Sequence, residues 1–222
     1  MKALIGSQNV LAFLLWLAAV TWGSVALVRY ESAAGPDRVA PTDWPSGSKI
    51  ARTGDAPTLV IFVHPECPCT RASLGELERI LARCPGRVRA FVVVVDETGL
   101  SMEATATPIW RAAAAVHGVN VLLDPKGMEA RIFQAMTSGR TLLYSAAGRL
   151  LFAGGITAAR GHAGDNDGSA AVSALLRGGK PERLTTPVFG CPLFSPCPFP
   201  IPNDHPARVN SPDKTRTPEG QG

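Results

Sequence analysis

One stretch of the sequence decides the fold: Leu59-Val-Ile-Phe-Val-His-Pro-Glu-Cys-Pro-Cys-Thr-Arg-Ala-Ser-Leu-Gly-Glu-Leu77. Its first five residues are apolar and rich in β-branched types, which predicts a strand that is buried on both faces. From Arg71 onward the apolar residues recur at helical spacing until a Pro-Gly pair ends the run. Cys67 and Cys69 are therefore predicted to lie in a strand-to-helix turn, where the exposed N–H groups of a helix stabilise a thiolate.

The residues after this stretch predict a mixed sheet with helices on it. Residues 89–95 form a second buried strand, so the first strand, the helix and this strand make a right-handed βαβ unit. The remaining predicted elements are a helix, a strand, a helix, the two strands of a hairpin and a closing helix, at residues 108–116, 119–123, 128–135, 141–145, 149–153 and 169–177. This order predicts an α/β sandwich in which helices cover both faces of the central sheet.

An apolar segment precedes this domain. Residues 10–28 carry no charge and are long enough to cross the hydrocarbon core of a membrane as a helix. A cleaved signal peptide is the alternative, because Ser32-Ala-Ala34 resembles a processing site, but the apolar region of a signal peptide is normally shorter. Arg29 and Arg38 follow the helix, so the charges do not favour export, although a long domain can be translocated regardless of charge.

Composition divides the chain into successive parts. They are an N-terminal segment, a transmembrane helix, a linker, the α/β domain and a Pro-rich tail, at residues 1–9, 10–28, 29–57, 58–178 and 179–222. The formal net charge of +4 is mild and the basic residues are scattered, so nucleic acid is not an expected partner. Five cysteines are an odd count and too few for a disulfide-stapled mini-protein. Cys84, at the end of the first helix of the domain, is predicted to be a structural thiol.

Two segments resemble a known family. Residues 59–77 are similar to the active-site strand, turn and helix of thioredoxin-fold proteins, and residues 122–156 resemble the second half of the membrane-anchored periplasmic members. The resemblance spans about residues 55–178 and implies a thioredoxin-like three-layer sandwich. With its apolar helix, the whole chain resembles a bacterial membrane-tethered thioredoxin-like protein, and it is also similar to a group labelled RedB.

The chain departs from that family at two places. The family motif has two residues between its cysteines, whereas Pro68 alone separates Cys67 from Cys69, and Glu66 stands at the usual nucleophile position. The family also places a cis-proline before the hairpin, facing the cysteines, where this chain has Ser138-Gly-Arg-Thr141. The usual substrate groove of the family is therefore not expected here.

The two cysteines of the turn have three interpretations. As a redox pair they would form a strained and easily reduced disulfide, with Arg71 lowering a thiol pKa and Glu66 opposing this effect. As metal ligands, Cys67 and Cys69 together with His64 or a distant histidine would suit copper(I) or zinc. In the third interpretation both thiols are structural. We favour the redox pair.

The loop of residues 154–168 is unusually rich in glycine and polar residues. In a thioredoxin-like sheet the last strand of the hairpin runs back toward the cysteines, so this loop is expected beside them. There His162 is a candidate proton carrier or distal metal ligand, with Asp165 orienting its ring. The alternative is a flexible glycine loop that ends in a helix cap.

The tail contains the last two cysteines. Ten of the 19 prolines lie in residues 181–218, which predicts a mostly extended or disordered chain. Within it, Cys191 and Cys197 stand among apolar residues that suggest docking onto the domain. The two tail cysteines could resolve a disulfide with Cys67 or Cys69, complete a four-sulfur metal site, or bridge each other. An oxidising compartment favours the last of these.

Three functions are compatible with these observations. The favoured one is a single-pass protein of the bacterial inner membrane with a periplasmic thioredoxin-like domain. As an enzyme it would be a thiol-disulfide oxidoreductase that needs no cofactor: Cys67 attacks, Cys69 resolves, and the clients are protein thiols or disulfides. The second function is delivery of copper or zinc to a metalloprotein client during assembly of a respiratory complex. The third is a scaffold without catalysis.

Overall fold

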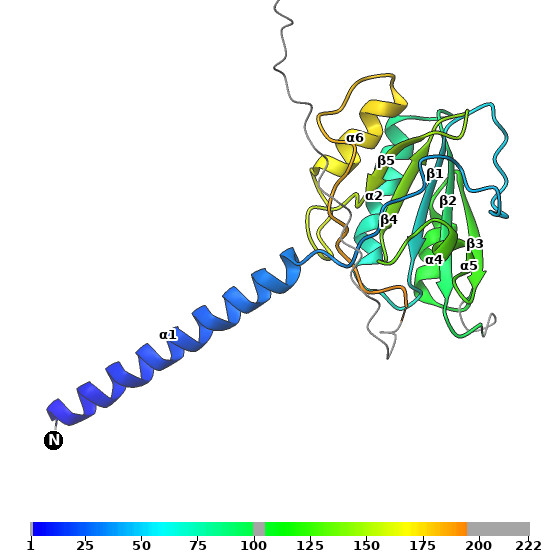
Figure 1. Cartoon of the computed structure of the whole chain (residues 1–222). Helices are drawn as coiled ribbons and strands as arrows, with labels where there is room; N and C mark the ends of the chain where they lie inside the picture. Colours follow the sequence, from blue (N-terminus) through cyan, green and yellow to red (C-terminus); the bar gives the residue numbers. More distant parts are fainter. Residues whose placement is uncertain (1, 100–104, 195–222) are drawn as a thin grey trace, which may run out of the picture.

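Five strands form one mixed sheet in the computed structural model, which describes residues 2–99 and 105–194 (Figure 1). The sheet order is β3-β2-β1-β4-β5, in which β3, β2 and β1 are parallel to one another and β4 and β5 are antiparallel to their neighbours. The strands are β1 (Thr58–Val63), β2 (Arg89–Asp96), β3 (Val119–Pro125), β4 (Arg140–Tyr144) and β5 (Leu150–Gly154).

The helices lie close to the predicted positions but differ at their ends. They are α1 (Lys2–Ser32), α2 (Thr70–Arg83), α4 (Pro108–Ala115), α5 (Met128–Ile132) and α6 (Asp167–Leu176). The helix predicted over residues 128–135 stops early, because Gln134 has a left-handed backbone with φ of 57°. The closing helix begins before its predicted start, because Asn166 is its N-cap and accepts a 2.8 Å hydrogen bond from the Ser169 N–H.

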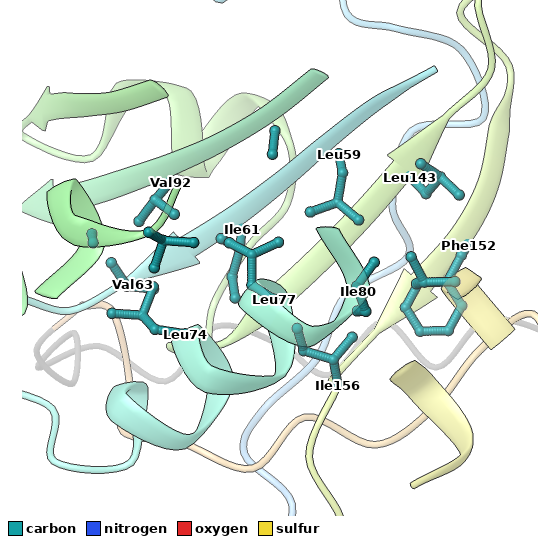
Figure 2. Packing of buried hydrophobic residues seen from close by; sticks show 14 of the residues in the cluster. Leu59, Ile61, Val63, Leu74, Leu77, Ile80, Val92, Leu143, Phe152 and Ile156 are labelled. Atoms are coloured by element: carbon teal, nitrogen blue, oxygen red, sulfur yellow. The ribbon is translucent and has the colours of Figure 1, made fainter. Parts of the chain in front are cut away.

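The first face of the sheet is covered by α2, α4 and α6. Strand β1 is buried along its whole length, and the apolar side of α2 packs on it (Figure 2). Leu77, at the centre of that helix face, lies beside Ile61 and is 0% exposed. Burial of this continuous cluster is the main favourable term that holds α2, and the turn before it, against the sheet.

The second face is covered by α5 and by segments without regular secondary structure. Ala40 and Ile50 are buried against this face, and the Tyr144 hydroxyl donates a 2.9 Å hydrogen bond to the Pro41 carbonyl. Much of the stretch predicted as a linker, residues 29–57, therefore packs along the domain. Residues from the start of the tail, Leu193 and Phe194, complete the same cluster.

The expected thioredoxin-like sandwich is confirmed by this topology. The unit β1-α2-β2 is followed, after α4, β3 and α5, by the hairpin β4-β5 and by α6. Strand β1 lies between its parallel partner β2 and its antiparallel partner β4, so the first half and the second half of the fold meet at β1.

Helix α1 extends away from the domain (Figure 1). The most apolar 18-residue window within Gln8–Ser32 has a mean hydropathy of 2.1, and none of that window is buried in the structure. A helix of 25 residues is about 37 Å long, which exceeds the roughly 30 Å thickness of a hydrocarbon core. By length and composition α1 can cross a membrane, and a signal sequence would have the same properties.

Replacement of Leu77 by Ala tests the packing of α2 on β1. We expect the full chain, unfolded by urea in detergent, to lose about 2–5 kcal/mol of stability, because the change leaves a cavity in a fully buried cluster. The matched control is Leu184→Ala at a side chain that is 52% exposed, with an expected loss within about 0.5 kcal/mol. Equal losses in the two variants would contradict the packing of α2 described above.

A candidate thiol site at the strand-to-helix turn

The turn between β1 and α2 presents Cys67 and Cys69 as predicted. The Cys67 N–H donates to the His64 carbonyl at 3.2 Å, and the Thr70 N–H donates to the Cys67 carbonyl at 3.1 Å. Cys69 is the N-cap of α2, and no side chain caps the helix there. The positive end of the α2 dipole therefore lies at the turn, where it favours negative charge on a sulfur.

A segment of the tail covers this turn. Residues Val188–Phe194, called here the docked segment, run antiparallel to the residues that precede β4. The Ser138 N–H donates to the Cys191 carbonyl at 2.8 Å, and the Leu193 N–H donates to the Met136 carbonyl at 2.9 Å. Cys67 is only 1% exposed beneath it, whereas Cys69 and Cys191 are each partly exposed.

Cys67 is the thiol that the site ionises most readily. Burial by itself would raise the pKa of Cys67, but four hydrogen bonds together hold that pKa below its usual range. They come from the backbone N–H and the thiol of Cys191 and from the hydroxyl groups of Thr70 and Ser138. A lowered thiol pKa gives more thiolate at neutral pH, which is the nucleophilic form.

The two neighbouring thiols stay protonated. Burial, followed by the charge on Cys67, raises the pKa of Cys69, and the Arg160 guanidinium opposes this effect. Burial, followed by the hydrogen bond to Cys67 and the charges on Cys67 and Cys69, raises the pKa of Cys191 to about 12. The site therefore combines one cysteine of lowered pKa with two neighbouring cysteines of raised pKa.

Ser138 takes the place of the family's proline. Its hydroxyl oxygen accepts a 2.9 Å hydrogen bond from the His64 N–H and lies 3.0 Å from the Thr70 hydroxyl oxygen. Gly139 follows with a φ of 93°, and its N–H donates to the Phe62 carbonyl at 2.8 Å. No peptide bond is cis in residues 2–99 and 105–194, so a hydroxyl faces the cysteines where the family has a ring.

The supporting residues predicted near the motif are His64 and Arg71. The ring of His64 is turned toward its own loop, because its Nδ1 accepts a 3.1 Å hydrogen bond from the Glu66 N–H. Arg71 is exposed on the first turn of α2. The hydrogen bonds that lower the pKa of Cys67 come from Cys191, Thr70 and Ser138.

The glycine-rich loop reaches the site through a residue other than the histidine. Arg160 hydrogen-bonds to Cys69 and donates to the Gly190 carbonyl of the docked segment. His162 is exposed, and its Nε2 lies 4.0 Å from a carboxylate oxygen of Glu31 at the end of α1. Asp165 is exposed and lines a separate hollow of about 340 Å³ at the start of α6.

The described residues provide no set of ligands for copper or zinc. Within residues 2–99 and 105–194 there is no group of three or more His, Cys, Asp or Glu side chains that could hold a metal ion. The copper or zinc alternative stays a prediction.

Cys191 carries a free thiol, and Cys197 lies outside the described residues, so the predicted bridge between them also stays a prediction. Cys84 is buried, and its thiol contacts the Ser173 carbonyl at 3.9 Å.

Three contributors to the site were not singled out by the sequence. Thr70 follows the motif directly and could have been suspected as a hydrogen-bond donor from its position alone. At Ser138 the sequence shows only the absence of a proline, and at Arg160 it indicates an anion-binding residue rather than a partner of Cys69. The sequence contained the signal for Ser138, because a polar residue at a position that faces two cysteines is itself an expected hydrogen-bond partner.

Comparisons with known proteins agree with the fold. No family model and no curated protein matches the sequence. The crystal structure of a hypothetical protein from Sinorhizobium meliloti is 22% identical with a TM-score of 0.52, over 72% of this chain and 93% of that chain. An uncharacterized conserved protein from Geobacillus kaustophilus is 20% identical with a TM-score of 0.50, over 75% of this chain and 93% of that chain.

A secreted disulfide oxidoreductase of Mycobacterium tuberculosis is less similar. It shares 18% identity with a TM-score of 0.35, over 43% of this chain and 66% of that chain, and we base no argument on it. Sequence identities this low show that the folds are similar and nothing more. The strand order is that of a thioredoxin-like fold, and the two uncharacterised proteins share the overall fold of this chain.

Replacement of Ser138 by Ala tests how the site ionises Cys67. The change removes a hydroxyl that hydrogen-bonds to the Cys67 sulfur, so we expect the pKa of Cys67 to rise and the thiolate fraction at neutral pH to fall. The measurement is the ultraviolet absorbance of the thiolate against pH, taken as the difference from a Cys67→Ser chain. The control is Ser145→Ala in the β4-β5 hairpin, which we expect to leave the titration unchanged. An unchanged titration in Ser138→Ala would contradict the assignment.

Proposed function

We propose that this protein exchanges disulfides with the thiols or disulfides of client proteins. The observation that carries the proposal is that Cys67, whose pKa is lowered, is hydrogen-bonded to the thiols of Cys69 and Cys191 at a thioredoxin-like turn. A thiolate beside a second thiol is the arrangement that disulfide exchange requires. No cofactor takes part in this chemistry.

The proposed thiol-disulfide exchange takes place in two steps. The Cys67 thiolate attacks one sulfur of a client disulfide, forms a mixed disulfide, and the other client sulfur leaves and takes up a proton. A second thiol of the site then loses its proton and attacks the Cys67 sulfur, which releases the remaining client thiol. The protein is oxidised by two electrons and the client is reduced by two. Run in reverse, the same steps oxidise a client dithiol.

The second thiol has two candidates. Cys69 was predicted for this role from the motif and contacts the Cys67 sulfur. Cys191 contacts it from the docked segment. The proposal needs one of these thiols to resolve the mixed disulfide, and it fails if neither does.

We further propose that α1 anchors the protein in the bacterial inner membrane, with the thioredoxin-like domain on the periplasmic side. Its length and hydropathy support a membrane span. A site that works through disulfides suits the oxidising side of that membrane, because cytosolic thiols are kept reduced.

Replacement of Cys67 by Ser tests the exchange. We expect the rate at which the reduced full chain reduces oxidised glutathione to fall by roughly tenfold or more, because ordinary thiols are only a few per cent ionised at neutral pH. Cys84→Ser is the matched control, since its buried thiol lies at the other end of α2, and it should keep the rate of the original chain. Equal rates in both variants would favour a scaffold without catalysis.

Removal of residues 2–32 tests the anchor. The full chain should stay with the membrane fraction after an alkaline carbonate wash, and the shortened chain should move to the soluble fraction. Sequencing of the mature N-terminus separates an anchor from a signal peptide. A mature chain that begins after residue 34 would overturn the anchor and leave the proposed exchange in place.

A further inference from the structure

The docked segment is fitted to its place by close backbone approach. A Cβ atom on Gly190 would lie 2.0 Å from the Ser138 carbonyl oxygen, and one on Gly155 would lie 2.5 Å from the Pro187 carbonyl oxygen. Side-chain carbons do not approach backbone oxygen this closely, so only glycine lets these segments meet. The position of the segment is therefore specific.

Apolar anchors hold both ends of the docked segment. Val188 is 1% exposed, Leu193 is 0% exposed and Phe194 is 9% exposed. The guanidinium carbon of Arg131 lies 4.0 Å from the centre of the Phe194 ring, a favourable cation–π contact. The Val188 carbonyl also accepts a 2.8 Å hydrogen bond from the Gly35 N–H, which ties the segment to the chain that follows α1. Buried residues thus flank Cys191 on either side.

This docking presents Cys191 to Cys67. Ser138 joins the two segments, because its N–H donates to the Cys191 carbonyl at 2.8 Å and its hydroxyl oxygen accepts a 2.9 Å hydrogen bond from the His64 N–H at the start of the Cys67 turn. Interactions with the backbone N–H and the thiol of Cys191 help to lower the pKa of Cys67 against the effect of burial. Building on the proposed exchange, we propose that Cys191 is the thiol that resolves the mixed disulfide on Cys67, so that the oxidised protein carries a Cys67–Cys191 disulfide. The tail thereby supplies a catalytic residue that the turn motif alone does not contain.

Chain geometry favours Cys191 over Cys69 in this role. A Cys67–Cys69 bridge would close a small ring across Pro68, and the fixed φ of proline limits how that ring can relax. Cys191 belongs to a segment far away in the sequence, so a bond between it and Cys67 closes no small ring. Cys69 is instead held by the Arg160 guanidinium, which also donates to the Gly190 carbonyl of the docked segment.

The order of events follows from burial and charge. Cys67 is 1% exposed, so the docked segment must lift before a client disulfide reaches it. Burial is the largest cause of the raised pKa of Cys191, and the hydrogen bond to Cys67 and the charge of its thiolate raise that pKa further. Both effects end once the Cys67 sulfur enters a mixed disulfide. When the segment returns, Cys191 loses its proton more readily and attacks the Cys67 sulfur, and the client thiolate leaves and takes up a proton.

The experiment identifies the disulfide directly. The full chain in detergent is equilibrated with reduced and oxidised glutathione, quenched with acid, alkylated and digested without reduction for mass spectrometry. We expect the Cys67–Cys191 linked peptides to be the main oxidised product. Cys69→Ser should keep this product and a two-electron equilibrium with glutathione, Cys191→Ser should lose the product, and Cys84→Ser should behave as the original chain.

The outcomes separate this inference from the proposed exchange. A Cys67–Cys69 disulfide as the main product would overturn the role of Cys191. So would a Cys191–Cys197 bridge in the original chain if Cys67 in Cys191→Ser kept its equilibrium with glutathione. Both results leave the exchange at Cys67 standing. If Cys67 enters no disulfide under any glutathione ratio, both proposals fail.

Gly190→Ala tests the docking without removing a sulfur. The added methyl group would collide with the Ser138 carbonyl, so the docked segment cannot keep its position. We expect the Cys67–Cys191 disulfide to form about ten- to a hundredfold more slowly, as misplacement of a reacting group predicts. Gly75→Ala, in α2 where an added Cβ meets nothing within 4 Å, controls for a glycine change and should leave the rate unchanged. Equal rates for Gly190→Ala and the original chain would overturn the proposal.

Discussion

The burial of β1 is the constraint on which the rest of the structure depends. Every residue of Thr58–Val63 is buried, and the strand has hydrogen-bonded neighbours on both sides and packed layers on both faces. A shift of one residue would move each side chain into the opposite layer, so its register is strongly fixed. The point where β1 ends is fixed with it, and the cysteine turn begins at that point.

The electrostatics of the turn come from segments that meet at the end of β1. Helix α2 offers an uncapped N-terminus, the chain before β4 offers the Ser138 hydroxyl, and the loop after β5 offers the Arg160 guanidinium. The tail adds the N–H and thiol of Cys191. The Ser138 hydroxyl and the Cys191 groups lower the pKa of the buried Cys67, whereas Arg160 acts on Cys69 and Cys191, whose pKa values burial raises.

The missing proline and the docked tail belong to one arrangement. The Ser138 N–H, just before β4, donates to the Cys191 carbonyl of the docked segment, and this segment covers the buried sulfur of Cys67. Arg160 connects this region to α1, because its N–H donates to the Glu31 carbonyl and its guanidinium lies 5.1 Å from the centre of the Tyr30 ring. Arg160 therefore links the end of the apolar helix to the docked segment and to Cys69.

The sequence by itself determined the local features: the buried strand, the cysteine turn, the helix after it, the order of elements and the apolar helix. These depend on periodicity and turn residues within short windows. Only the tertiary structure decided that Cys191 contacts Cys67, that Ser138 hydrogen-bonds to that sulfur, and that residues predicted as linker and tail cover the domain. Those contacts join segments far apart in the chain through close backbone approach at glycines such as Gly190, and no local pattern encodes which segments meet.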